Sequence, residues 1–484
     1  MYKHGTYGEM GESVVTAVEK SETVTVYIGT APVNLIREYA KKGIINEPFR
    51  IENAGGKNTF GHSDNWDMFT LCEVMDAHFN NPKGNIGPIY VINVLDPDTH
   101  RKQEQTTKDI TFSNGMAEIE SDTIILDTLA IDDKVEGTDY TLTYSNGKTV
   151  IKSTTITGTV QASYYEVVDV TKSDIIGGVT EDGVYSGISV AERIYPVYGV
   201  IPTLYAAPKW SSEPEVYEAL ISAAQQMNGH WYGFVIADIP VTESTIQEAI
   251  QWKKTNGYNS MYSKVCWPMV TYAGKKYHIS TLAIIEMMRN DIENDGIPMG
   301  TCSNKSIKCD AQYFGNSAVN QGFDILAGNE LNAKGITTVV SWNGAYQLWG
   351  PHTAGYEADD TGNAKADVDM LAIFDSNIRM QEYLLNEFQS AWGTQVDEPM
   401  TIGLKDSILE SEQERLDGLV ARGALIGNPT VEFSESENSD EDMLNGNFKW
   451  KITDTPAPLG KSYTAKVVCT DSGYSALIAT EEEA

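Results

Sequence analysis

Apolar runs of strand length recur along most of this chain, and segments with helical spacing of apolar residues lie between them. The predicted strands are residues 23–29, 88–95, 231–237, 264–272 and 336–342, and the predicted helices are 64–79, 212–227, 242–253 and 280–289. Strands that are apolar on both faces and alternate with helices are typical of a largely parallel sheet covered on both sides. The pattern therefore predicts an α/β core.

A different pattern interrupts this alternation between residues 102 and 166. Short alternating runs at 123–126, 140–144 and 149–153 are separated by the dipeptides Glu136-Gly137 and Asn146-Gly147. Asn-Gly between two β-prone runs is a strong hairpin signal. We predict an inserted β-rich domain at 102–166, which divides the α/β core into a first part at 23–101 and a second part at 167–353.

Both ends of the chain carry β-prone runs that lack an obvious local partner. Residues 1–22 are polar and glycine-rich around one short run at 14–18, which predicts an extended N-terminal arm. After residue 354, two amphipathic helices end near Gly423, and an acidic loop at 432–442 precedes β-prone runs at 448–453, 463–470 and 474–479. We predict a C-terminal α+β domain at 354–473 and a C-terminal arm at 474–484.

Four large rings follow the last predicted core strand. Trp342, Tyr346, Trp349 and His352 lie in a segment rich in glycine and proline, and strands more often end in small polar turns. Rings held in this way are typical of a fixed contact platform.

The charge balance excludes some partners. The chain has 484 residues, of which 68 are acidic and 35 basic, for a net charge of −33. Such a balance argues against nucleic acid or an anionic membrane as the main partner and favours a basic one. No signal-peptide or membrane-spanning run is evident, which predicts a cytosolic protein without membrane insertion. Five scattered cysteines predict reduced thiols.

Motifs for chemistry are incomplete. Gly460-Lys461-Ser462 and Gly147-Lys148-Thr149 resemble the end of a phosphate loop, but Thr455 and Leu142 stand where its first glycine is required. No HExxH, GxSxG or strand-linked GxGxxG occurs, and the seven histidines show no ligand-pair spacing. We predict neither cofactor nor metal. Asp238, at the end of a predicted strand, is the best acidic candidate, although capping the turn before Pro240 is its simpler role. A hydrolase built from distant Ser, His and Asp stays open.

Several segments, taken in order, resemble the tail sheath proteins of contractile phage tails and injection particles. They are HGTYGE with TVTVYIGTAPV near the N-terminus, SDIIGG, IPTLYAAPKWSSEPEVYEAL leading to GFVIADIP, ELNAKGITTVVSWNGAYQLWGPHT, RMQEYLLNEFQSAWGTQVDEPMT and LDGLVARGALIG. The resemblance covers roughly 1–30, 165–350 and 370–480. It implies a subtilisin-like α/β domain without protease activity, so the chain would not be an enzyme. Competing hypotheses are a subtilisin-like hydrolase and a surface-layer protein, although the latter class normally carries an export signal.

The resemblance also implies how the chain would assemble. It would form a helical homo-oligomer of stacked rings around a tail tube protein, with baseplate and tail terminator proteins as further partners, in a virion or phage-like tail assembled in the bacterial cytoplasm. Its arms would exchange strands with neighbours, and Trp342 and Trp349 would be largely buried where the core joins the C-terminal domain, with an inter-subunit contact as the alternative. The implied N-terminal arm residues are Val14, Val15, Ala17 and Val18; the C-terminal arm residues are Tyr474, Ala476, Leu477 and Ile478; and the receiving hairpin contains Phe448, Trp450, Ile452, Ala465, Val467 and Val468.

Overall fold

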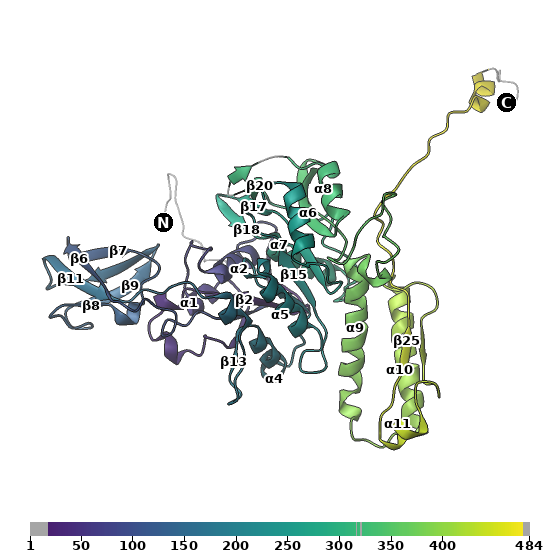
Figure 1. Cartoon of the computed structure of the whole chain (residues 1–484), viewed down its shortest axis with the longest axis horizontal. Coiled ribbons are helices and arrows are strands. Elements are labelled where there is room, and N and C mark those ends of the chain that lie inside the picture. Colours follow the sequence, from purple (N-terminus) through teal and green to yellow (C-terminus); the bar gives the residue numbers. More distant parts are fainter. Residues whose placement is uncertain (1–17, 316, 320–321, 478–484) are drawn as a thin grey trace, which may run out of the picture.

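A nine-stranded sheet forms the centre of the molecule. The computed structural model describes residues 18–315, 317–319 and 322–477 (Figure 1). In spatial order the strands are β19 (Ser306–Ile307), β23 (Ala345–Trp349), β22 (Ile336–Trp342), β16 (Ser263–Cys266), β15 (Phe234–Asp238), β14 (Leu204–Ala206), β2 (Thr25–Gly29), β5 (Ile89–Asn93) and β3 (Pro48–Ile51). The strands from β22 to β5 are parallel, which confirms the predicted parallel sheet, and antiparallel strands close both edges.

The sheet joins strands from both sides of the β-rich insertion. Leu204 of β14 pairs with Thr25 of β2, although 179 residues separate them in sequence. The central strands are fully buried, because helices cover both faces and leave no strand side in water.

Five helices of eight or more residues pack on this sheet. They are α2 (Thr70–Phe79), α5 (Pro214–Ala224), α6 (Ile246–Thr255), α7 (Ile279–Glu293) and α8 (Ile325–Asn332). Pro214 occupies the first turn of α5, where a missing N–H costs nothing, and the Thr245 and Asp324 side chains cap α6 and α8. α7 is buried along most of its length.

Shorter elements lie in the core and along the rest of the described chain. They are β1 (Val18–Lys20), β4 (Asn85–Gly87), α1 (Gly56–Phe60), α3 (Lys172–Ile176), α4 (Ile194–Tyr198), β12 (Gly178–Val179), β13 (Tyr185–Ser186), β17 (Met269–Tyr272), β18 (Lys275–Tyr277), β20 (Ala311–Phe314) and β21 (Ser317–Val319), with 3-10 turns at Val33–Leu35, Tyr39–Lys41, Leu126–Thr128, Gly187–Arg193, Trp210–Ser212, Met370–Ala372, Gly393–Gln395 and Ser472–Leu477. The predicted single strand at 264–272 is wrong. It divides into β16 and β17 around Pro268, which has no N–H to donate to a ladder.

The insertion forms two three-stranded sheets around its own apolar cluster. One sheet has the order β7 (Met116–Glu120), β10 (Lys148–Lys152), β9 (Thr141–Ser145), and the other β6 (Thr106–Phe112), β11 (Gly158–Tyr164), β8 (Ala130–Ile131). Asn146 and Gly147 have φ of 52° and 77°, as a two-residue hairpin turn requires, which confirms the predicted hairpin. The sandwich projects from one side of the core (Figure 1).

A helical unit follows on the opposite side. Its long helices are α9 (Asp375–Trp392) and α10 (Ile402–Ala421). They are followed by β24 (Thr430–Glu432), α11 (Asp440–Leu444) and β25 (Lys451–Thr453), and β24 and β25 form a two-stranded antiparallel sheet. These elements share an apolar cluster that includes Met380, Leu384, Leu416 and Leu419. Beyond this unit the chain runs away from the body as an extended segment (Figure 1). Within the described ranges, no helix combines the length and hydropathy needed to cross a bilayer.

Candidate functional site

Asp238 lies at the carboxyl end of β15, as predicted, but it does not cap the turn before Pro240. Its Oδ1 accepts the backbone N–H of Ser280 at 3.1 Å, and its Oδ2 accepts the Ser280 hydroxyl. Both residues are buried. The carboxylate therefore holds the first turn of α7. The role that we predicted for it, capping the turn before Pro240, is wrong.

His278 is the histidine nearest to this serine in sequence, and it is held by another acid. Its Nδ1 lies 2.7 Å from Glu73 Oε2, and its backbone N–H donates to Glu73 Oε1 at 2.6 Å. Burial alone would lower the pKa of His278, but the Glu73 carboxylate raises it to about 9. An imidazole that is protonated at neutral pH cannot accept a proton from a serine hydroxyl. Glu73, Asp238 and His278 line a cavity of about 720 Å³. The ion pair between Glu73 and His278 links α2 to the start of α7.

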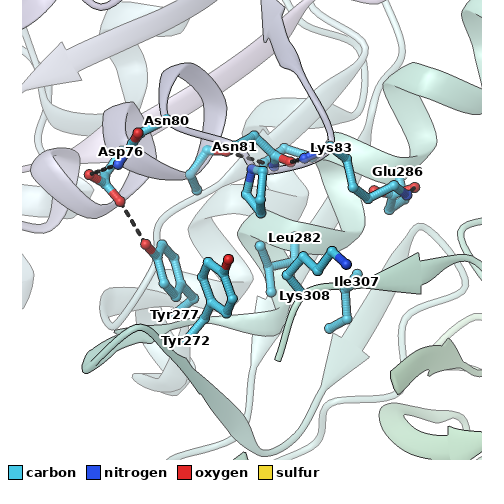
Figure 2. Close-up of a pocket in the computed structure, with 13 residues that line it drawn as sticks. Asp76, Asn80, Asn81, Lys83, Tyr272, Tyr277, Leu282, Glu286, Ile307 and Lys308 are labelled. Atoms are coloured by element: carbon cyan, nitrogen blue, oxygen red, sulfur yellow. Dashed lines mark hydrogen bonds and ion pairs between the residues drawn. The ribbon is translucent and has the colours of Figure 1, made fainter. Parts of the chain in front are cut away.

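A second pocket lies where α2 ends beside α7, and Figure 2 shows its polar groups engaged with one another. Asp76 accepts the Tyr277 hydroxyl at 2.6 Å, and Lys83 pairs with Glu286 at 2.7 Å. The volume of about 30 Å³ is enough for a water molecule and too small for an organic substrate. This pocket is a joint between elements of the core.

The other candidates for chemistry have structural partners. Lys461, from the incomplete phosphate loop, donates to Gly362 O at 2.9 Å. Asp359, which lies before α9, accepts the backbone N–H groups of Thr361 and Asn363. In the part of the chain that the structure describes, no three His, Cys, Asp or Glu side chains gather as metal ligands. All five cysteines are free thiols, as predicted.

The aromatic segment after β22 is a strand rather than a loop. Asn343 and Gly344, with φ of 53° and 78°, turn the chain so that β23 pairs antiparallel with β22. Trp342 is 49% exposed, so the prediction that it is buried is wrong. The reason is that β22 extends beyond the buried part of the sheet, so its last two residues are exposed to solvent. Trp349 is half-buried, and its Nε1 donates to Asn329 Oδ1 at 3.1 Å.

We expect Trp342→Ala to lower the free energy of unfolding by less than about 1 kcal/mol, because the ring is half in water already. Trp267, which is fully buried in the same sheet region, is the matched control, and Trp267→Ala should cost about 3–5 kcal/mol. Urea denaturation followed by circular dichroism measures both. Equal losses for the two variants would contradict the exposed position of Trp342.

The core meets the helical unit through a charged cluster that the sequence analysis missed. Lys264 of β16 and Asp375 of α9 are fully buried, with Nζ 3.0 Å from Oδ2. Lys264 Nζ also donates to Gly350 O and His352 O, and the His352 ring stacks on Tyr356 with centroids 3.5 Å apart. A lysine inside an otherwise apolar strand was the available signal, because a buried ammonium requires a partner.

The structure places the predicted arm residues as follows. Val14, Val15, Ala17 and Ile478 lie outside the described residues. Val18 belongs to β1, whose backbone pairs in parallel with β4 of the same chain, opposite Asn85. Ala476 and Leu477 lie in the last 3-10 turn, and Tyr474 is 67% exposed.

The predicted hairpin between 448–453 and 463–470 is not formed. Instead, β25 with Ile452 pairs with β24, while Phe448 and Trp450 pack near Phe433. Ala465, Val467 and Val468 lie in an extended run whose residues, from 462 to 471, are all exposed. Tyr463, Val467 and Val468 in this run are large apolar side chains that the subunit itself leaves exposed.

These two features leave backbone groups open for another chain. Within the described ranges, the sheet of β24 and β25 has no third strand, and the run at 462–470 has no ladder partner. A strand with free N–H and C=O groups and an open sheet edge are complementary in geometry. Both features leave backbone hydrogen-bonding groups accessible at the surface of the subunit.

Comparison with known proteins agrees with this geometry. No family model matches the chain. A curated tail sheath protein of Burkholderia phage BcepMu is 27% identical over 496 residues, which cover 95% of this chain and 95% of that protein. The chain is thus similar, along nearly its whole length, to a phage tail sheath protein. The tail sheath protein of Escherichia phage P2 is also similar, with 24% identity over 64% of this chain and 73% of its own length.

A similar fold occurs in a chain of a contractile injection system. A chain in the contracted sheath complex of the extracellular system PVC has a TM-score of 0.53 and 13% identity, and the match covers 98% of this chain and 99% of that chain. The relatives are structural proteins, and nothing in them supports the hydrolase hypothesis.

Proposed function

We propose that this chain is the structural subunit of a contractile tail sheath, which polymerises helically around an inner tube and contracts to drive the tube through a bacterial envelope. One observation carries the proposal: a fully exposed, unpaired extended run at 462–470 lies beyond an open two-stranded sheet. The likeness to a phage tail sheath protein over 95% of the chain supports it.

Subunits join by exchange of terminal strands. Each backbone hydrogen bond formed by a strand that adds to a sheet edge contributes about 0.5–1.5 kcal/mol, and alternate side chains set the register. In this proposal the receiving sheet is β24 with β25, and the donated segments are the N-terminal arm and the run that leads through Tyr474, Ala476, Leu477 and Ile478. Because Val18 already pairs with Asn85, the donated N-terminal residues are those before it, including Val14, Val15 and Ala17.

A polymer of this kind repeats without closing, since each subunit gives strands to one neighbour and receives them from another. Gly5, Gly8 and Gly11 in one arm, and Ser472-Gly473 in the other, provide hinges that let subunits move while the exchanged strands stay paired. Contraction then releases a metastable extended state and requires no nucleotide.

The partners follow from the same assembly. The subunit contacts further copies of itself, the tail tube protein, and the baseplate and tail terminator proteins at the two ends of the polymer. A net charge of −33 suits contacts with basic residues of the tube or of the next ring. The tail is assembled in the cytoplasm of the bacterial host.

Electron microscopy of the purified chain tests the proposal, and we expect striated tubes or rings. Val15→Pro should prevent their formation without lowering the stability of the subunit, because it blocks a donated strand. Val26→Pro is the matched control: Val26 is fully buried in β2, so this change should unfold the subunit itself. Polymers of normal length formed by Val15→Pro, or equal loss of monomer stability in both variants, would contradict the assigned roles.

A further inference from the structure

The face of α9 that packs on the core is largely polar. Asp375, Arg379, Glu382 and Asn386 recur at helical spacing and are all buried, whereas Met380 and Leu384 on another face join the apolar cluster of the helical unit. Helices usually dock through an apolar stripe. Apolar contact crosses the joint at two points, since Ile378 of α9 belongs to the core cluster and Ile297, which follows α7, belongs to the cluster of the helical unit. Hydrogen bonds and ion pairs form much of the rest of the joint.

Part of this joint is a row of hydrogen bonds between α9 and the segment 225–232 that follows α5. Gln225 Nε2 donates to Glu382 Oε1 at 3.1 Å. One turn further along α9, Asn386 accepts the Tyr232 N–H at 2.9 Å and donates to Tyr232 O at 2.8 Å. Gln389 then donates to His230 O at 2.8 Å. Glu382 is the only member of this row on α9 that can ionise within the described residues.

Glu382 has no cation of its own in this joint. The neighbouring Arg379 binds Asp291 of α7 through both of its terminal nitrogens, and Asp291 also accepts the Thr23 hydroxyl at 2.8 Å. The remaining ionisable groups nearby add little positive charge: Tyr205 on β14, and Glu22, Asp295, Tyr383 and Glu387, which line the adjoining cavity of about 400 Å³. An ionised Glu382 would therefore be a buried charge whose neighbouring cation, Arg379, is already paired with Asp291.

We propose that the joint between the core and the helical unit is a proton-linked latch, in which neutral Glu382 keeps α9 docked on the 225–232 segment and its ionisation opens that contact. The cavity beside Glu382 holds enough volume for several waters, which would solvate the carboxylate once the row separates. Because α9 continues into the unit that carries β24 and β25, opening would change how the strand-exchange sheet is held relative to the core. That consequence rests on the function proposed above; the latch itself does not.

The electrostatic surroundings support this geometry. Burial raises the pKa of Glu382 to about 8, with the Gln225 hydrogen bond and Arg379 acting in the opposite direction. In the opened state the carboxyl returns to its ordinary pKa near 4.3. Because the carboxyl binds its proton more tightly in the docked state, protonation stabilises docking fully at pH values below the free pKa. This stabilisation is lost as the pH rises through the pKa of the docked carboxyl. The latch is thus closed in acid and weakened by about pH 8.

Hydrogen exchange of the full chain tests the latch. The Tyr232 N–H donates to Asn386, so its exchange reports opening of the row. Between pH 6 and 8 we expect the protection factor of the peptide containing Tyr232, corrected for intrinsic rates, to fall by about fiftyfold. Glu382→Gln keeps the shape of the neutral carboxyl and cannot ionise, so its protection should be the same at both pH values. Light scattering confirms that the assembly state is equal in the two samples.

Glu410→Gln is the matched control, because Glu410 is exposed on α10 and its change alters the net charge equally. This variant should show the wild-type fall in protection. An unchanged protection factor in the wild type between pH 6 and 8 would overturn the latch, as would the same fall in Glu382→Gln. Neither result depends on polymer formation, so failure of the latch and failure of the proposed sheath function are distinguishable.

Discussion

A chain that ends at Lys461 is expected to fold normally and to form no polymer. The described residues from 462 to 474 are all exposed, and the last contacts of this segment with the body are those of Lys461 with Tyr356 and Gly362. Removing side chains and backbone that contact only water should change the free energy of unfolding by less than about 0.5 kcal/mol. The loss of one donated strand per subunit should abolish assembly, as measured by sedimentation and negative-stain microscopy.

A chain that ends at Thr480 is the control for this truncation. It loses only residues 481–484, which are three glutamates and an alanine, and retains Tyr474, Ala476, Leu477 and Ile478. We expect it to assemble as the full chain does. If the chain that ends at Lys461 formed polymers, the C-terminal segment would not be needed for assembly. A large loss of monomer stability would show that this segment packs on its own subunit.

Lys264→Met is expected to lower the free energy of unfolding by about 3–5 kcal/mol, because it removes the cation that is ion-paired with the buried carboxylate of Asp375. Both partners are fully buried, and among the described residues Asp375 then keeps the Thr301 hydroxyl at 2.9 Å as a side-chain donor. Urea denaturation of the dispersed subunit measures the loss. The double variant Lys264→Met with Asp375→Leu should recover most of it, since no buried charge then remains.

An exposed pair provides the comparison for this experiment. Lys172 and Glu215 lie 2.6 Å apart with side chains that are 44% and 56% exposed. Solvent screens such a pair, so Lys172→Met should lower the free energy of unfolding far less than Lys264→Met does. If Lys264→Met cost no more than Lys172→Met, the buried cluster would not hold the helical unit on the core.

The alternation of strands and helices was predictable because it depends on local periodicity. The buried strand from Phe234 to Asp238 follows from a short apolar run, and the Asn146-Gly147 hairpin follows from two residues that readily adopt positive φ. Placing Asp238 at a strand end needed nothing beyond the same pattern. Its partner was not predictable, because Ser280 is 42 residues away and is brought close only when α7 packs on the sheet.

Local composition was enough to predict most of the core strands and helices and the β-rich insertion, and the ordered resemblance to tail sheath proteins is likewise a property of the sequence. A short apolar run is β-prone wherever it lies, but Val467 and Val468, which we predicted in a hairpin, form no strand in the subunit. The packing of distant segments set which strand pairs with β25, the exposure of Trp342 and the contact of Lys264 with Asp375. Those outcomes depend on contacts between segments that are distant in sequence. Such contacts produce no periodic pattern of residues from which they could be predicted.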